Sequence, residues 1–524
     1  MASSPFIRLR LRVMMFLQFF VWATWMVPIA AYGPQALGLD GAQMGWIFSC
    51  TAIAAMISPL FVGYVADRWF ATERILCLLH LLGGGLMIAA GLQTSFWPFF
   101  GLLLASTLCY MPTLALANSL TFANIDDANT FSWIAVFGTI GWIVSGWIVG
   151  LAIGETNATF FTLAGGIEIA LGLYCLTLPH TPPKGKEAGG DVLGLNALRL
   201  LKDPSFSLFV VSAFLISIPA VQYFVQATLF LAETDRPAPA TLMTLCQFSE
   251  IFVMATLPLF IARFGLERVL AIGMGMWAIR YLAFSTLNFP LVILALLVHG
   301  FCYCFVYVGS FIYVDTKVPQ ELRASAQSFI SFLMLGVGWF LGSHVAGFVS
   351  DLYPPQVQIT TTVQGSSETT TVPMPAWPKL VELLDTDDDG LITTFDLDAI
   401  DPEAKEFQDK FAEVAGNPPA YNFAELDMAL QDLDTHAPVL DKGDVAAVVA
   451  SQMRISKEAY TAACVRPWHS IWQWPALFAG VVCVIFSMTL GGSKPSEDGT
   501  DAETESENSG DPADEPSPSE NDET

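Results

Sequence analysis

Long apolar runs, each about as long as a bilayer is thick, dominate the sequence. An α-helix of about twenty residues crosses the roughly 30 Å hydrocarbon core. With 53% hydrophobic and 14% charged residues, the composition is typical of a membrane protein. We predict an all-α membrane protein with twelve transmembrane helices. Their expected ranges are 11–32, 43–66, 74–93, 96–122, 131–153, 158–179, 205–231, 239–262, 268–288, 290–315, 324–349 and 470–490.

The apolar runs form two halves with a similar pattern. The fifth run contains GTIGWIVSGWIVG and the eleventh GVGWFLGSHVAG, and both are glycine-rich at a spacing that allows close helix packing. Two six-helix halves that hold a substrate between them near the midplane are typical of transporters. We expect an N-terminal half at 1–182, a linker at 183–204, helices seven to eleven at 205–350 and helix twelve at 469–491.

The basic residues indicate how the chain is oriented. Most of them, such as Arg8 and Lys202, fall in loops on one side, which the positive-inside rule makes cytoplasmic. Both termini are then cytoplasmic, whereas residues 351–468 face outward. This insert and the acidic tail at 492–524 carry most of the net charge of −26, and the tail's composition predicts disorder. No basic patch suggests nucleic-acid binding.

One intramembrane carboxylate is the main functional candidate. Glu250 lies in the middle of the eighth apolar run, three residues after Gln247, so the two share a helix face. Ionisable residues at this depth are costly and are functional candidates by default. Gln222 and Gln226 on the seventh run share a face in the same way. Amides and one carboxylate in an apolar cavity suit a small neutral solute such as a sugar or a nucleoside.

Two further features bear on this site. Aromatic residues on the fifth and tenth runs, among them Trp142 and Tyr303, offer stacking surfaces. Arg280 lies fifteen residues after Gly265, and Glu250 fifteen residues before it, so the two charges have similar depth on consecutive helices. They form a structural ion pair, or Arg280 tunes a Glu250 that carries a proton; the sequence leaves both readings open.

Several short strings resemble one known family. FLQFFVWATW at Phe16, YMPTLALANSL at Tyr110, FGTIGW at Phe137, QFSE at Gln247 and RASAQ at Arg323 are similar to the nucleoside:proton symporter family of the major facilitator superfamily. The resemblance covers all twelve expected helices. It implies a monomeric importer of nucleosides with protons in the cytoplasmic (inner) membrane. It also implies a substrate site made of Thr139, Trp142, Gln222, Gln247, Glu250 and Tyr303. From the residues themselves we add Gln226, which shares a face with Gln222, and expect Glu250 to carry the proton.

The chain departs from the family pattern at two positions. The resemblance leads us to expect an Arg four residues before Thr139, where the chain has Ala135. It also leads us to expect an Asp directly after Tyr303, where the chain has Cys304. A missing base and a missing acid leave the cavity nearly neutral and remove a group that takes part in proton coupling. A facilitator for another polar solute such as a sugar remains an alternative.

The outward insert contains an EF-hand pattern. After a Thr-rich linker, DTDDDGLITTFD begins at Asp385 with the central glycine of such a loop at Gly390. We expect an EF-hand-like helical insert that binds Ca²⁺ weakly, with competition from Mg²⁺, because the last position is Asp instead of Glu. The predicted ligands are Asp385, Asp387, Asp389, Leu391 through its carbonyl, Thr393 and Asp396.

The same features bear on function classes other than transport. A calcium-responsive membrane sensor built on a transporter body is the alternative from a different class. An enzyme is not expected, because the sequence offers no nucleophile with a base, no metal site in the membrane and no phosphate-binding loop. Flux discriminates the two remaining readings, since a sensor binds its ligand without uptake.

Overall fold

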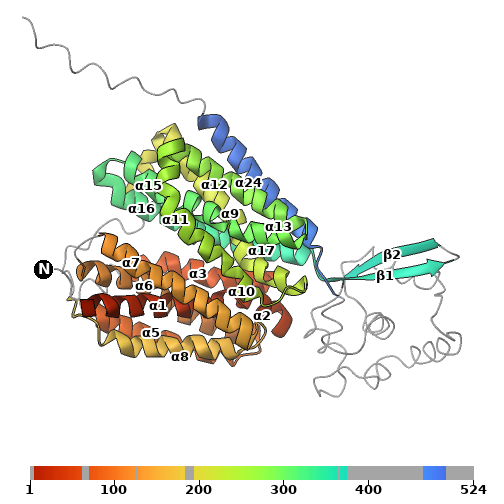
Figure 1. Cartoon of the computed structure of the whole chain (residues 1–524), viewed down its shortest axis with the longest axis horizontal. Helices are drawn as coiled ribbons and strands as arrows, with labels where there is room; N and C mark the ends of the chain where they lie inside the picture. Colours follow the sequence, from red (N-terminus) through yellow and green to blue (C-terminus); the bar gives the residue numbers. More distant parts are fainter. Residues whose placement is uncertain are drawn as a thin grey trace, which may run out of the picture.

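The N-terminal half is a bundle of long helices. The structure, a computed structural model, describes residues 5–61, 70–125, 128–182, 194–363, 366–373 and 464–490. In Figure 1 the N-terminal helices, in red to orange, pack together below the green and blue helices of the second half. The helices of the first half are α1 (Pro5–Met26), α2 (Ile29–Ala36), α3 (Gly41–Phe61), α5 (Thr72–Gly91), α6 (Phe96–Ala123), α7 (Ala128–Ile148), a π-helical turn (Val149–Ile153) and α8 (Thr159–Cys175).

The C-terminal half is built from helices that are often interrupted. A 3₁₀ segment (Leu195–Lys202) precedes it. Its elements are α9 (Pro204–Glu233), α10 (Pro239–Met243), α11 (Leu245–Phe264), α12 (Leu266–Ser285), α13 (Phe289–Leu297), α14 (His299–Tyr303), a π-helical turn (Cys304–Val308), α15 (Gly309–Lys317), a 3₁₀ turn (Gln320–Leu322), α16 (Arg323–Ser331), a π-helical segment (Phe332–Gly338), α17 (Trp339–Leu352) and α24 (Trp468–Leu490).

The helices agree with a membrane protein of many spans. Nine described segments are long and apolar enough to cross a bilayer, and α13 with the helical segments that follow it makes a tenth, bent by 42°. The expected spans at 158–179 and 268–288 are also helical. However, α8 has only 17 residues, and α12 carries Glu267, Arg268 and Arg280. The all-helical membrane architecture is therefore supported, whereas the number twelve remains a prediction.

The start of the outward insert differs from the expectation. Residues predicted to form a Thr-rich linker are instead an antiparallel hairpin of β1 (Gln356–Val363) and β2 (Ser366–Pro373). β-branched Thr, Val and Ile residues favour extended strands, which explains the correction. The expectation of an entirely helical chain is thus wrong here. The predicted EF-hand, with all six of its proposed ligands, lies outside the described residues.

The two ends of the insert are held together at the membrane body. The backbones of Gln356 and Val465 exchange two hydrogen bonds of 3.0 Å. Next to Val465, Arg466 forms a buried ion pair with Glu233 at the end of α9. The indole of Trp468 also donates to Glu233, at 3.0 Å. The insert therefore leaves and re-enters the bundle at one point, which fixes the ends of α17 and α24 against α9.

The halves meet along a seam at the end of the bundle where the hairpin leaves (Figure 1). There α3 packs on α17, and α7 packs on α10. The Asp351 carboxylate accepts the backbone N–H groups of Gly41 at 2.6 Å and Ala42 at 2.8 Å, at the positive end of α3. A Cβ on Gly347 would lie 2.1 Å from the Gly41 carbonyl oxygen, so only glycine allows this approach. We call the contacts of Gly41, Ala42, Gly347 and Asp351 the seam.

A second contact between the halves lies at the same end. Glu155, in the loop before α8, accepts the backbone N–H of Ala240 at 2.8 Å. Burial raises the pKa of Glu155 above its usual value, and this hydrogen bond offsets only part of that rise. Nearby, Thr241 donates to the carbonyl of Gly146 at 3.3 Å. The halves are thus joined by hydrogen bonds at two places on one end of the bundle.

Candidate functional site

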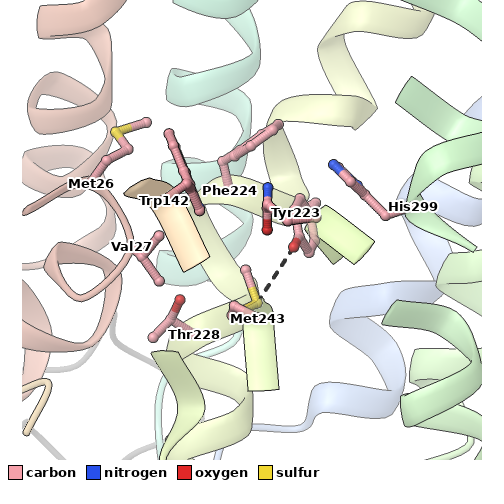
Figure 2. Close-up of a pocket in the computed structure, with 9 residues that line it drawn as sticks. Met26, Val27, Trp142, Tyr223, Phe224, Thr228, Met243 and His299 are labelled. Carbon is pink, nitrogen blue, oxygen red and sulfur yellow. Dashed lines mark hydrogen bonds between the residues drawn. The ribbon is translucent and has the colours of Figure 1, made fainter. Parts of the chain in front are cut away.

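A pocket lies between the two halves. Figure 2 shows Met26 and Val27 on one side of it, and Tyr223 and His299 on the other. The first two residues belong to the N-terminal half, and the other two to α9 and α14. The full lining consists of Met26, Val27, Trp142, Tyr223, Phe224, Thr228, Met243, Gln247 and His299. This placement agrees with the expectation of a substrate between the halves.

Helix α9 provides one wall of the pocket and several polar groups without partners. Tyr223, Phe224 and Thr228 line the pocket, and the buried Thr228 hydroxyl has no hydrogen-bond partner in the described part of the chain. The amide of Gln222, 1% exposed, likewise has no partner for its nitrogen or its oxygen among the described residues. Buried polar groups are almost always hydrogen-bonded, so these groups suggest a place for a polar ligand or for water.

Ser249 holds the break between α13 and α14. The broken helix frees the carbonyl of Leu297 and the N–H of Gly300. The Ser249 hydroxyl donates to the first and accepts from the second, at 3.0 Å. A Cβ on Gly300 would lie 2.4 Å from the Ser249 carbonyl oxygen, so glycine is needed for this close packing. Neighbouring groups that satisfy freed backbone are the condition for a broken helix inside a membrane. The break places His299 beside the pocket.

Arg280 supports the pocket wall from behind. Its side chain is completely buried, and its guanidinium carbon lies 3.7 Å from the ring centre of Tyr223. It also donates from Nη1 to Nδ1 of His299, at 2.8 Å. Because arginine is always a donor, His299 must accept at Nδ1 and carry its hydrogen on Nε2. His299 therefore offers the pocket a neutral N–H donor.

The structure does not contain the ion pair that the equal depths of Glu250 and Arg280 suggested. Within the described residues, no ion pair joins them. Arg280 instead contacts His299 and the rings of Tyr223, Trp277 and Phe284. Cation–π contacts of this kind are worth about 2 kcal/mol or more when desolvated, so aromatic faces can accommodate a buried guanidinium. Of the two readings, the structural ion pair is therefore wrong for this conformation.

Two of the predicted substrate residues, Trp142 and Gln247, line the pocket directly. The other five lie near it. Thr139 precedes Trp142 by one turn of α7, and Gln222 is next to Tyr223 on α9. The amide of Gln226 donates to the Ala346 carbonyl at 3.2 Å, and therefore points to α17.

The two remaining predicted residues lie on α11 and α14, one turn beyond lining residues. Glu250 follows Gln247 by three positions. Tyr303 stacks on His299, with ring centres 5.8 Å apart. The Glu250 carbonyl accepts a weak bond from the thiol of Cys304, at 3.7 Å. Neither residue is part of the pocket lining in this conformation.

Sequence reasoning missed most of the lining. Tyr223 and Phe224 lie between the two predicted glutamines of α9, and His299 begins the HGFCYCF segment that was used only for its tyrosine. Met26 and Val27 became lining residues because the first helix breaks between α1 and α2, which nothing but Pro28 announced. His299 lies one helical turn before Tyr303, and this spacing was a signal in the sequence that could have identified His299 as a lining residue.

The chain matches the family model described as Nucleoside H⁺ symporter over residues 6–368. It is 41% identical over 359 residues to the putative nucleoside transporter YegT of Escherichia coli. This match covers 65% of this chain and 84% of YegT. It is 32% identical over 370 residues to the xanthosine permease of the same organism, across 66% of this chain and 88% of that protein.

Solved structures give the same picture. The crystal structure of the nucleoside transporter NupG has a TM-score of 0.62 with this structure and 28% sequence identity, covering 66% of this chain and 91% of NupG. A bacterial homologue of the lysosomal transporter Spinster, 15% identical, covers 93% of this chain with a TM-score of 0.60. The second likeness is one of fold only.

Removing the hydroxyl of Ser249 tests how the pocket wall is held. Ser249→Ala leaves the Leu297 carbonyl and the Gly300 N–H without partners, and we expect a loss of about 1–3 kcal/mol. Thermal unfolding of the purified protein in detergent should show a midpoint lower by a few degrees. The matched control is Ser310→Ala, because the buried Ser310 hydroxyl bonds only the Val306 carbonyl of its own helix. Equal melting of both variants would contradict the role of Ser249.

Proposed function

From the premise that the chain belongs to the nucleoside H⁺ symporter family, we propose that it imports nucleosides together with protons across the bacterial inner membrane by alternating access. The carrying observation is the pocket between the halves, which combines aromatic faces with a few polar groups. Mostly apolar walls with a few converging polar groups are typical of small-molecule sites. The chain is a multi-pass membrane transporter, and we propose that it works as a monomer.

The lining matches the two parts of a nucleoside. Trp142, Phe224 and Tyr223 offer flat faces on which a base can stack. Gln247 and Thr228 offer donors and acceptors for hydroxyl groups of the ribose. His299, held as a donor by Arg280, suits a carbonyl oxygen of the base. Gln222 and Glu250, adjacent to the lining, join the site when the helices move. In this way each buried polar group gains a partner from the substrate.

The seam indicates which side of the membrane is closed. The positive-inside rule puts the loops near residues 41, 155, 239 and 351 on the outer side. The hydrogen bonds of Asp351 and Glu155 between the halves lie at this end. We infer that the structure is closed to the outside, and that breaking the seam opens the pocket to incoming nucleoside. Both termini are then cytoplasmic and the insert is extracytoplasmic.

Glu250 is the proposed proton carrier beside the substrate. A carboxylate at this depth is costly when charged, so it binds a proton readily and loses it when the site is hydrated. Ala135 and Cys304 supply no charge to the site, which leaves Glu250 as the acid on the face of Gln247. A ligand shifts the equilibrium between two conformations only as far as it binds one of them more tightly than the other. Proton and nucleoside transport are therefore coupled if protonation of Glu250 and nucleoside binding favour the same conformation.

We expect Glu250→Gln to abolish proton-driven accumulation while leaving exchange of nucleoside down its gradient. The amide keeps the size and hydrogen bonds of the side chain but cannot release a proton. Accumulation of labelled uridine in proteoliposomes with an inward proton gradient measures the effect. Glu267→Gln is the control, because Glu267 pairs with Lys317 near the surface, at 3.2 Å. Wild-type accumulation by Glu250→Gln would show that Glu250 carries no proton.

For the insert we propose a weak calcium site in the loop from Asp385 to Asp396. The support is the ligand spacing in the sequence together with the paired ends of the insert, which root it at one point on the outer side. Extracellular EF-hand modules bind calcium at about 10⁻⁴–10⁻³ M. Because no feature of the sequence couples this loop to the transporter body, calcium is proposed to stabilise the insert only.

Calcium titration of the purified protein tests this site. We expect binding with a dissociation constant of about 10⁻⁴–10⁻³ M, weakened by Mg²⁺. Asp385→Ala, which removes the first ligand, should abolish binding, whereas Asp441→Ala outside the loop should not. Uridine uptake should be the same with calcium and with a chelator. Undiminished binding by Asp385→Ala would rule out the proposed loop.

A further inference from the structure

A second cluster of buried ionisable groups lies within the N-terminal half, away from the pocket. His80 on α5 and Glu168 on α8 are both completely buried, and His80 Nδ1 lies 3.4 Å from Glu168 Oε1. Gln18 on α1 is also completely buried, and its side-chain oxygen Oε1 lies 3.1 Å from His80 Nε2. A Cβ on Gly83 would lie 2.6 Å from Glu168 Oε1, so a glycine makes room for the carboxyl group.

The hydrogen bonds around Gln18 have a direction, and this direction assigns the protons. The Thr113 hydroxyl donates to the Tyr110 carbonyl at 2.6 Å, so its oxygen accepts from Nε2 of Gln18, also at 2.6 Å. The remaining Oε1 of Gln18 then accepts from His80, which must carry a hydrogen on Nε2. The Tyr110 hydroxyl, which donates to the Gln18 carbonyl, fixes this part of α1.

One proton therefore lies between His80 and Glu168. With hydrogen on Nε2, a neutral His80 presents a lone pair at Nδ1 to Glu168, so the carboxyl must be protonated to bond it. If His80 is instead the doubly protonated cation, Glu168 is the matching anion. Both arrangements contain the same proton and have no net charge. Loss of the proton leaves a bare carboxylate in the membrane interior, which is strongly disfavoured.

Among the described residues, no Lys or Arg forms an ion pair with Glu168 that could take over this role. The titratable groups that face it are Tyr110 and Cys109, both from α6. Helix α1 contributes the neutral Gln18. In the described part of the chain, no Lys or Arg forms an ion pair with Glu168, and its Oε2 has no hydrogen-bond partner. An unpaired oxygen on a buried carboxyl group marks a place where water can bond it.

The pair is connected to the pocket through α1. Gln18 lies on the same helix as Met26, which lines the pocket. Between them, Trp22 packs against Tyr110, with ring centres 6.1 Å apart, and against Trp142 at 5.7 Å. A change in the hydrogen bonds of Gln18 therefore acts on the helix and on the tryptophan that form one side of the substrate site.

We propose that His80 and Glu168 form a second proton-binding site, located in the N-terminal half, and that release of its proton is coupled to movement of α1. This inference rests on the proposed proton symport and adds a proton site to it. The pair holds its proton while it is buried, and loses it when the helices separate and water enters. Glu250 acts beside the substrate, whereas this site acts on the helix that contacts it.

The test uses Glu168→Gln in the full-length protein, reconstituted in proteoliposomes. We expect nucleoside exchange without a gradient to continue with unchanged KM, because Glu168 lies outside the pocket. Accumulation driven by an inward proton gradient should fall at least tenfold, and its pH dependence should flatten. Tyr174→Phe on the same helix is the control, since the Tyr174 hydroxyl bonds only the Arg10 carbonyl, and it should accumulate like the wild type.

A second variant keeps the proposal testable if the first one does not fold. If Glu168→Gln does not fold, His80→Gln replaces it, because a glutamine amide can still donate to Gln18, and the same loss of accumulation is expected. Wild-type accumulation with wild-type pH dependence in either folded variant would overturn the proposal. Failure of the nucleoside assignment looks different, because the wild type itself would then show no nucleoside exchange.

Discussion

The pocket depends on a serine that satisfies a broken helix. Inside a bilayer, an interrupted helix is stable only if its freed carbonyl and N–H groups find partners within the protein. Ser249 supplies both, to Leu297 and Gly300. The bend that results places His299 at the wall of the pocket, opposite Met26 and Val27. Since Ser249 is two residues after Gln247, one segment of α11 both contributes to the lining and holds the helix that completes it.

The two halves differ in what surrounds their buried ionisable side chains. In the C-terminal half the guanidinium of Arg280 lies among aromatic rings and holds His299 as a neutral donor, which suits recognition of an uncharged polar substrate. In the N-terminal half the buried Glu168 and His80, which we propose to share one proton, form no ion pair with a Lys or Arg among the described residues. The first arrangement fixes geometry, and the second can change its charge. The proposed proton sites thus lie in different halves, Glu250 beside the pocket and the His80–Glu168 pair away from it, with α1 and Trp22 connecting the pair to the pocket.

Much of the fold could be predicted from the sequence, because helix length and hydropathy are local properties. The apolar runs located the helices, and the polar positions Gln247 and Trp142 located part of the pocket. The break at Val298 could not be predicted, because it depends on Ser249, which lies elsewhere in the chain. The break before α2 had Pro28 as its only signal. The ion pair of Arg280 with Glu250, one of two interpretations that the sequence left open, does not form among the described residues. Equal depth on two helices does not fix the direction in which a side chain points, and Arg280 contacts aromatic rings instead. The hairpin of β1 and β2 shows that composition alone does not distinguish a linker from a pair of strands, because this Thr-rich segment was predicted to be a linker.

The central claim is that this chain moves nucleosides together with protons. The most direct measurement is uptake of labelled uridine and adenosine by proteoliposomes that contain the purified protein, with and without an inward proton gradient. We predict that both nucleosides accumulate above the external concentration with the gradient, and that an uncoupler removes the accumulation while exchange continues. Equilibration without accumulation would contradict proton coupling and indicate a facilitator. Absence of any nucleoside flux would contradict the account as a whole.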